Sequence, residues 1–385
     1  MTALPRIVRR VFSAAVVFLA LARPVLAEGE PARPEAGDPD VGSRIAGAVA
    51  FDGRLWLMGG ARQMPGQNWA LVSYDLATGT RVRAYSKGVA GLLAANGRFW
   101  ILRQTSEGNY VLEEWTGNAF IERAKFSASQ RNPLLALTAV GSRPAVLQLK
   151  GLRIMEDQGW RELKAKPSPE NILGWGLAST ATPADGSALY IGFDRGEWGG
   201  GMVRLDLKTG SLDEIESNAP AASGYAGGGT LLNGGLDPVN GIIPDPANPD
   251  CVIAAVGLVH FESAGRILRV CGREVSLIFE KLHPYQYDGR TMTVSEAFFG
   301  LHPSKDGFWA ISNGGVYRFG KAGEPAHFDP PKLEDWNGLH ISRALPGVLV
   351  MTTDVNWAMS VSGYTPMIVP LEDPAPASPS PGQEQ

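Results

Sequence analysis

The sequence contains little charge and almost no clustering of basic residues. Charged residues make up 19% of its 385 positions, and Lys and Arg form no run beyond the pair Arg9-Arg10. Because binding to nucleic-acid phosphates needs clustered cations, we expect no nucleic-acid partner. No apolar stretch after residue 27 is long enough to cross a bilayer, so we also expect no membrane span in the mature chain.

Local signatures of several enzyme classes are missing as well. The sequence has no Gly-x-Ser-x-Gly motif, and no Lys-Ser/Thr follows the glycine runs at 199–201 and 227–229. A nucleophile elbow and a phosphate-binding loop are therefore not indicated. The chain has five His, and no two of them stand in a His-x-x-x-His arrangement. No enzyme class follows from these absences.

The first 27 residues have the pattern of a signal peptide. Arg6, Arg9 and Arg10 form a basic start, Val11–Ala22 is apolar but too short to span a bilayer, and Val25–Ala27 offers small residues for cleavage. The Arg pair weakly resembles a twin-arginine signal, although ordinary Sec export is the expectation. Removing this segment takes away four Arg and no acid, so the formal charge changes from −4 to −8.

The remaining chain divides into three parts by composition. Residues 28–43 and 372–385 are rich in Pro, Ala and acidic residues, lack apolar periodicity, and are predicted to be disordered tails. Residues 44–371 form the folded domain. We expect a periplasmic or secreted monomer.

Only two Cys occur, Cys251 and Cys271, and both fall in one predicted hairpin. In an oxidising compartment they could form a cross-strand disulfide. The alternative is a pair of buried free thiols that act as small apolar side chains.

A short pattern of a tight turn followed by an apolar-aromatic strand recurs along residues 44–371. The best copies are Asp52–Leu57, Asn96–Ile101 and Asp306–Ile311, and looser copies are Asp185–Gly192 and Asn248–Ile253. The Asp/Asn-Gly pairs supply the positive φ that tight hairpins need. A strand-only repeat of roughly 40–50 residues is typical of a β-propeller, with one blade per repeat.

The second half of the repeat is a strand that enters another turn, as in Val72–Gly79 and Val203–Gly210. Seven such segments, each with an inner strand before and an outer strand after it, predict an all-β, seven-bladed propeller of four-stranded antiparallel blades. Six or eight blades remain as alternatives because the third repeat, near Arg143–Val146, is degenerate. In the last blade we expect Leu339–Ala344 to be the inner strand and Pro366–Leu371 the outer one.

Two segments resemble known propeller repeats. Lys305–Phe319 resembles the repeat of two-component-regulator sensor propellers, and Asp245–Asp250 resembles the strand-linking turn of sialidase-type repeats. These motifs occupy structural positions and carry no catalytic residue. The resemblance implies the fold and leaves function open, because propellers serve as lyases, lactonases, dehydrogenases and scaffolds.

The four longest connections fall in the fourth to sixth blades, and strand order sends them to one face. They are residues 193–201, 216–238, 257–266 and 280–295. Long loops on a rigid scaffold commonly form binding sites. The candidate ligand-binding residues are Asp194, Arg195, Glu197, Trp198, His260, His283, Tyr285, Tyr287, Trp336 and Trp357. The alternative is that these loops only shield the mouth of the ring.

Asn240, Glu296 and His340 are expected near the starts of three inner strands. Such residues from different blades can meet at a channel mouth, where they could hold a divalent cation. Lactonase-like propellers use acid and amide ligands around calcium, and virginiamycin-lyase-like ones use His and Glu, but this chain matches neither set clearly. We therefore expect no cofactor, and keep a divalent cation as the alternative.

These observations favour an exported propeller that binds a protein, peptide or glycan through the loops of blades four to six. One alternative is a metal-assisted enzyme, a lyase or a lactone hydrolase, with its site at the channel mouth, and another is a domain with only a scaffolding role.

Overall fold

The computed structural model describes residues 45–60, 69–167, 177–222, 229–260, 262–320, 324–336, 339–352 and 366–371. The predicted signal peptide and both predicted tails lie outside these residues. The described part of the chain is built from β-strands, with a single 3-10 turn, η3 (Gly196–Trp198). No helix in this part is long and apolar enough to cross a membrane.

The first sheet has seven strands because the 15-residue strand β4 belongs to two successive blades. It is the outer strand of the first blade in its first half and the inner strand of the second blade in its second half. The sheet contains β1 (Ile45–Phe51), β2 (Arg54–Gly59), β3 (Trp69–Asp75), β4 (Arg81–Ala95), β5 (Arg98–Ser106), β6 (Asn109–Trp115) and β7 (Phe120–Ser127).

Five four-stranded sheets follow, which we call blades three to seven, and two short hairpins lie between blades. Blade three contains β8 (Leu134–Val140), β9 (Arg143–Gln148), β10 (Gly151–Glu156) and β11 (Gly159–Lys164); blade four contains β12 (Leu177–Ala181), β13 (Ala188–Asp194), β14 (Gly200–Asp206) and β15 (Leu212–Ile215). Blade five contains β18 (Val239–Pro244), β19 (Cys251–His260), β20 (Glu262–Cys271) and β21 (Glu274–Phe279).

Blade six contains β24 (Phe298–Ser304), β25 (Gly307–Ser312), β26 (Gly315–Phe319) and β27 (Ala326–Phe328); blade seven contains β28 (Glu334–Trp336), β29 (Leu339–Ser342), β30 (Val348–Thr352) and β31 (Met367–Pro370). The hairpins are β16 (Ser217–Pro220) with β17 (Thr230–Leu232), and β22 (Leu282–Tyr287) with β23 (Arg290–Ser295). All strand pairs in these sheets are antiparallel. The described strands therefore form seven four-stranded units.

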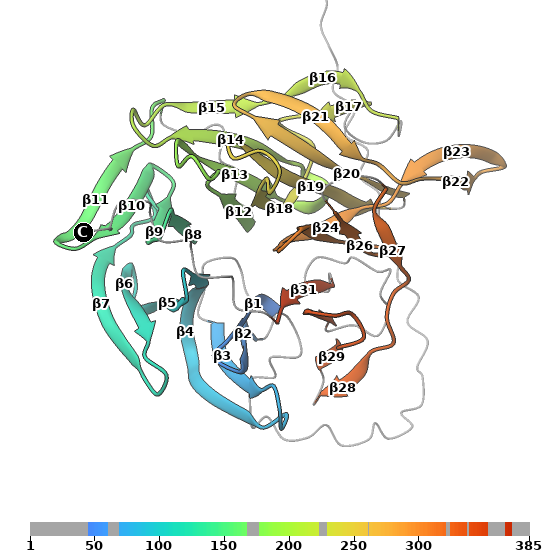
Figure 1. The fold of residues 1–385 in the computed structure, drawn as a ribbon. Helices are drawn as coiled ribbons and strands as arrows, with labels where there is room; N and C mark the ends of the chain where they lie inside the picture. Colours follow the sequence, from blue (N-terminus) through green and yellow to red (C-terminus); the bar gives the residue numbers. More distant parts are fainter. Residues whose placement is uncertain are drawn as a thin grey trace, which may run out of the picture. The chain divides into compact units, whose positions relative to one another are not determined.

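The innermost strands contact one another in the order β1, β4, β8, β12, β18 and β24. Strand β31 contacts both β24 and β1 and so completes the circle (Figure 1). This is the arrangement of a β-propeller, as the repeats predict.

In blade seven, the order of the strands from the centre of the ring outward is reversed: the last strand in the sequence is innermost and the first is outermost. The innermost strand is β31, which contacts β24 and β1, while β28 lies at the outer edge of the sheet. The expectation that Leu339–Ala344 is the inner strand is therefore wrong. Ile368 and Val369 of the inner strand are apolar and buried, but Leu339 and Ile341 of β29 are equally buried, so residue type alone does not set this order.

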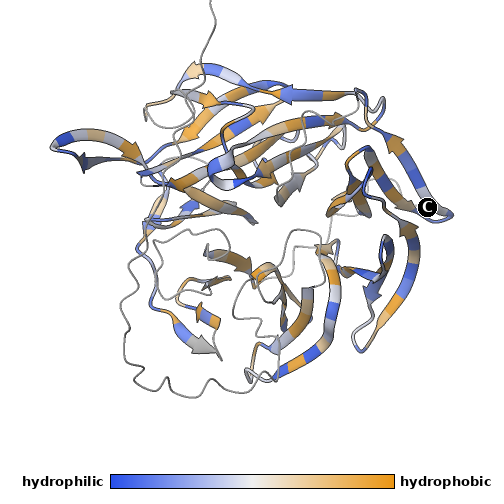
Figure 2. Ribbon diagram, turned by 180° about the vertical axis from the view of Figure 1, so that it is seen from behind, coloured by the Kyte–Doolittle hydropathy of each residue, from blue (hydrophilic) through white to orange (hydrophobic). Residues whose placement is uncertain are grey.

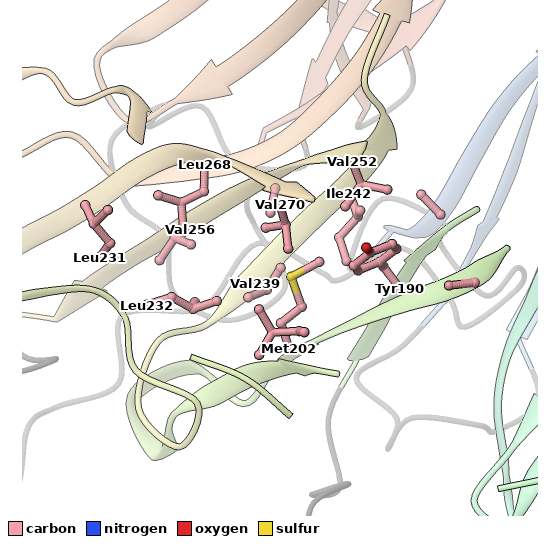
Figure 3. Packing of buried hydrophobic residues seen from close by; sticks show 14 residues of the cluster. Tyr190, Met202, Leu231, Leu232, Val239, Ile242, Val252, Val256, Leu268 and Val270 are labelled. Atoms are coloured by element: carbon pink, nitrogen blue, oxygen red, sulfur yellow. The ribbon is translucent and has the colours of Figure 1, made fainter. Parts of the chain in front are cut away.

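Apolar clusters between neighbouring blades form the core. Between blades four and five, Tyr190 and Met202 face Val252, Val256 and Leu268 (Figure 3). Burying one such aliphatic or aromatic side chain contributes about 1.5–3 kcal/mol. Figure 2 shows hydrophobic and hydrophilic positions alternating along the long outer strands, as expected where one face packs and the other meets solvent.

The turns between strands follow from the local sequence. Asp52 and Gly53 adopt φ values of 54° and 67°, and Asn96 and Gly97 adopt 52° and 66°. Two consecutive residues with positive φ define the type I′ turn that matches the twist of a hairpin. The recurring Asp/Asn-Gly pairs therefore set where strands reverse.

Candidate functional site

Long segments of blades four and five meet at one edge of the ring, which we call the rim. The rim consists of residues 194–199 and 233–238 and of the end of the β19–β20 hairpin, residues 256–260 and 262–266. Glu197 Oε2 lies 2.8 Å from His260 Nδ1, and an Arg195 guanidinium nitrogen (Nη2) lies 3.4 Å from the carbonyl oxygen of Gly235. Segments distant in sequence are thus joined by direct polar contacts.

The turn that carries Trp198 is held by its own backbone and by Asp194. Asp194 Oδ1 accepts a hydrogen bond from the Gly196 amide at 2.7 Å, and the Arg195 amide donates to the Gly199 carbonyl at 2.9 Å. A Cβ atom on Gly199 would lie only 2.2 Å from the Gly235 carbonyl oxygen, so only glycine fits there. Trp198 itself is 76% exposed.

A buried ion pair forms the base of the rim. Arg266 Nη2 lies 2.8 Å from Asp237 Oδ2, with side-chain exposures of 3% and 8%. Arg266 Nε also donates to the Leu231 carbonyl at 2.7 Å, and the backbone N–H of Asn233 donates to Asp237 Oδ2 at 2.8 Å. These bonds satisfy both charges and fix residues 231–237 against blade five, because a buried charge is tolerated only when it is paired.

A shallow, solvent-open hollow with an accessible volume of only about 10 Å³ lies beside this ion pair. Its walls are mostly apolar, and its lining residues are Leu236, Asp237, Pro238, Val256, Leu258, Ala264, Gly265 and Arg266. Leu236 is 50% exposed, and its Cα would lie 3.2 Å from a Cβ on Gly199, the residue after Trp198. Exposed Trp198 and Leu236 are thus carried on turns that touch.

The structure brings together only some of the residues singled out from sequence. Asp194, Arg195, Glu197, Trp198 and His260 all lie on the rim. His283 and Tyr285 lie instead on the β22–β23 hairpin, which projects outward beyond β20 (Figure 1). For Tyr287 and Trp336, the structure describes the backbone strand but not the side chain. Trp357 lies outside the described residues.

The sequence suggested that the segment 280–295 is a loop. In the structure it forms an antiparallel hairpin instead. Tyr285 pairs with Met292, and His283 with Val294, so these side chains share one face. Gln286 and Thr291 lie on the opposite face, where the amide nitrogen donates to the hydroxyl at 2.7 Å. The turn residues Asp288 and Gly289 have φ values of 48° and 71°.

Of the three candidate metal ligands, Asn240 lies in β18, Glu296 in the segment before β24, and His340 in β29. The Asn240 amide donates to the carbonyl oxygens of Gly257 and Phe298 at 2.8 and 2.7 Å, which fixes blade five to blade six. His340 lies in β29, separated from the innermost strand β31 by β30, and not on an inner strand as expected. Within the described residues, no group of three or more His, Cys, Asp or Glu could hold a metal ion.

Glu296 takes part in a hydrogen-bonded cluster of blade six. Its Oε2 accepts hydrogen bonds from Ser312 Oγ at 2.7 Å and from the Tyr317 hydroxyl at 2.8 Å. Burial and the hydrogen bond to Glu296 raise the pKa of Tyr317, so the phenol keeps its proton and acts as a donor. This cluster connects the segment before β24 to β25 and β26.

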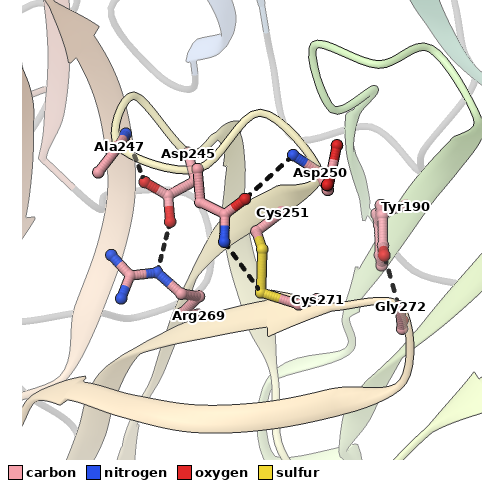
Figure 4. The surroundings of a disulfide bond; sticks show 9 residues. Tyr190, Asp245, Ala247, Asp250, Cys251, Arg269, Cys271 and Gly272 are labelled. Carbon is pink, nitrogen blue, oxygen red and sulfur yellow. Dashed lines mark hydrogen bonds and ion pairs between the residues drawn. A yellow bond between two sulfur atoms is a disulfide. The ribbon is translucent and has the colours of Figure 1, made fainter.

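Cys251 and Cys271 are directly paired residues of β19 and β20 and form a disulfide (Figure 4). Around it, Asp245 pairs with Arg269, and the Tyr190 hydroxyl donates to the Gly272 carbonyl at 3.1 Å. The disulfide lies at the end of the β19–β20 hairpin opposite the tip that contributes to the rim. It therefore braces the scaffold and not the candidate site.

Sequence reasoning missed Leu236, Asp237 and Arg266. The available signal was Arg266 itself, which with Arg269 is one of two charged residues in the mostly apolar strand Ala264–Val270. A charge at a position expected to be buried requires a partner. That partner, Asp237, is 29 residues away and has no local pattern that identifies it.

No protein-family model matches this chain, and no curated protein matches it in sequence. Among solved structures, PorZ, described as an essential bacterial surface component of the type-IX secretion system of Porphyromonas gingivalis, matches with a TM-score of 0.51 and 13% identity over 84% of this chain and 47% of its own. The extracellular domain of a protein described as a one component system from B. thetaiotaomicron matches with a TM-score of 0.48 and 11% identity. The match covers 85% of this chain and 38% of that chain.

A third match, YCF48 bound to D1 peptide, has a TM-score of 0.47 and 11% identity over 82% of this chain and 90% of its own. The chain spans less than half the length of the first two matches. At such low identities the likeness establishes the fold alone, and the β-propeller predicted from the repeats is confirmed.

Proposed function

We propose that this protein is exported and binds a protein, peptide or glycan partner through the rim. The observation that carries the proposal is Trp198, a large aromatic side chain that is 76% exposed on a turn fixed by Asp194 and Gly199. Tryptophan is strongly enriched among the residues that dominate binding energy, because it buries a large area at little entropic cost.

Two further features support this proposal. Leu236 is 50% exposed on the turn that touches the Trp198 turn and borders the shallow hollow, so each of the two turns offers an exposed apolar side chain to a partner. The leader-like segment 1–27 and the Cys251–Cys271 disulfide both fit an oxidising compartment outside the cytoplasm.

The test is partner capture with matched variants. The purified protein, Trp198→Ala and the control Ile121→Ala are cross-linked to partners in the native host, and the affinity for each captured partner is then measured. Ile121 is also an exposed apolar residue, at 44%, but lies on β7 of blade two. We expect Trp198→Ala to weaken binding at least tenfold with unchanged melting. Equal binding by Trp198→Ala and wild type would refute the proposal.

A further inference from the structure

The rim has a patterned surface that is more specific than an apolar patch. In the β19–β20 register, Val256 pairs with Arg266, Leu258 with Ala264, and His260 with Glu262. Because side chains of a strand alternate between faces, these six residues share one face. The face therefore changes from the buried Arg266 through the apolar walls of the hollow to a polar pair at the hairpin tip.

The polar end of this face has an unsatisfied anion. Glu262 Oε2 is buried and has no hydrogen-bond partner among the described residues. Leaving a buried carboxylate oxygen unpaired costs free energy, and a cation held near the Glu262 carboxylate would lower that cost by electrostatic attraction. Glu197 lies across from the tip, through its contact with His260.

The surroundings of the hollow carry more acid than base. Carboxylates are supplied by Asp194, Glu197 and Glu262, and the carboxylates of Glu214 and Glu216 lie beside Gly234. Of the rim's cations, Arg266 is neutralised by Asp237, which leaves Arg195 as the remaining guanidinium. The electrostatic complement of this surface is a cation.

We propose that the rim binds an extended peptide segment with an aliphatic or aromatic anchor and a Lys or Arg two residues away; this rests on the proposed function. The anchor contacts Leu236, Leu258 and Ala264, and the cation meets Glu262. Ala264 and Glu262 are two residues apart on one strand, a separation of about 7 Å. Residues i and i+2 of an extended peptide have the same spacing and project on one side.

The test uses synthetic peptides and the intact mature protein. One peptide carries Leu and Lys at i and i+2; others place Lys at i+1, or replace it with norleucine or Glu. We expect the i, i+2 peptide to bind at least tenfold more tightly than the others, and to weaken as salt rises because its ion pair is partly exposed. Glu262→Gln should remove this preference.

Glu122→Gln serves as the matched control, because Glu122 is an exposed carboxylate on β7, far from the rim in the ring. It should leave all affinities unchanged. Equal binding of the Lys and Glu peptides, an unaltered preference in Glu262→Gln, or no peptide binding at all would overturn the inference. If a captured partner still depends on Trp198 in that case, the proposed function stands and only the peptide class is wrong.

Discussion

Glu197 and His260 lie 2.8 Å apart, Oε2 to Nδ1, and join the turn of blade four to the hairpin tip of blade five. Both side chains are more than a third exposed, so this contact contributes less than about 1 kcal/mol to global stability. Its importance is local, because it holds the turn that carries Trp198 against the neighbouring blade.

Glu197→Ala should loosen the Trp198 turn without unfolding the protein. We expect faster amide hydrogen exchange at residues 195–199 and no measurable change in the unfolding midpoint, because only a surface contact is lost. Glu122→Ala, which removes another exposed carboxylate, should leave exchange at 195–199 as in wild type. Unchanged exchange in Glu197→Ala would show that the contact does not restrain the turn.

Removing one partner of the buried pair Asp237–Arg266 should be far more damaging. Asp237→Ala leaves the Arg266 guanidinium buried and without its carboxylate, and we expect a loss of about 3–5 kcal/mol in the free energy of unfolding, measured by denaturant titration. The control is Glu162→Ala, which breaks the more exposed pair with Arg153 and should cost about 1 kcal/mol or less. Similar losses in the two variants would contradict this interpretation of the rim's base.

Reduction of the disulfide should destabilise the propeller without altering the rim. The bridged residues are 20 apart in sequence, and closing a loop of that length in the unfolded chain stabilises a protein by about 3 kcal/mol. The unfolding midpoint should fall on adding reductant, and a variant with both Cys changed to Ala should no longer respond. A midpoint that reductant leaves unchanged in the wild type would argue against the bond.

His302 should make stability fall in mild acid. Burial lowers the pKa of His302 from 6.5 to about 4, and its Nδ1 is buried without a hydrogen-bond partner among the described residues. Between these two values the unfolded chain binds a proton that the folded chain does not, so stability is full above pH 6.5 and decreases toward pH 4. The decrease amounts to about 3 kcal/mol, at 1.36 kcal/mol per pKa unit.

The measurement is the free energy of unfolding between pH 7 and pH 4 for wild type and His302→Leu. The variant lacks the titrating group, so its curve should be flatter in that window by the same amount. Parallel curves would mean that His302 gains its proton as readily in the folded protein as in the unfolded one.

The sequence predicted the parts of the fold that depend on neighbouring residues. Asp52-Gly53 and Asn96-Gly97 mark turns because their backbone preferences are local, and the strands follow from period-two alternation. The direction of blade seven could not be predicted in this way. It depends on whether Ile368 or Ile341 fits against β24 and β1, which is decided only when the ring closes.

For the candidate site, too, the sequence predicted some of the residues but not the contacts between distant segments. Trp198 and its charged neighbours stood out because they occupy a long loop, and topology placed that loop beside the β19–β20 tip. The contact between Glu197 and His260 spans 63 residues, and the burial of Asp237 depends on Arg266 of another strand. Neither relationship has a periodic signal. Conversely, Tyr285 looked like part of the same site, but hairpin pairing within 282–295 carries it outward.

The most direct test of the account is site-specific photo-cross-linking at the rim. A photoreactive phenylalanine analogue replaces Trp198 in one protein, Leu236 in a second and Ile121 in a third, and each is irradiated in the native host. The account predicts that the same partner is captured from positions 198 and 236 and is absent from position 121. Capture from position 121 alone, or different partners at 198 and 236, would contradict a single binding surface formed by blades four and five.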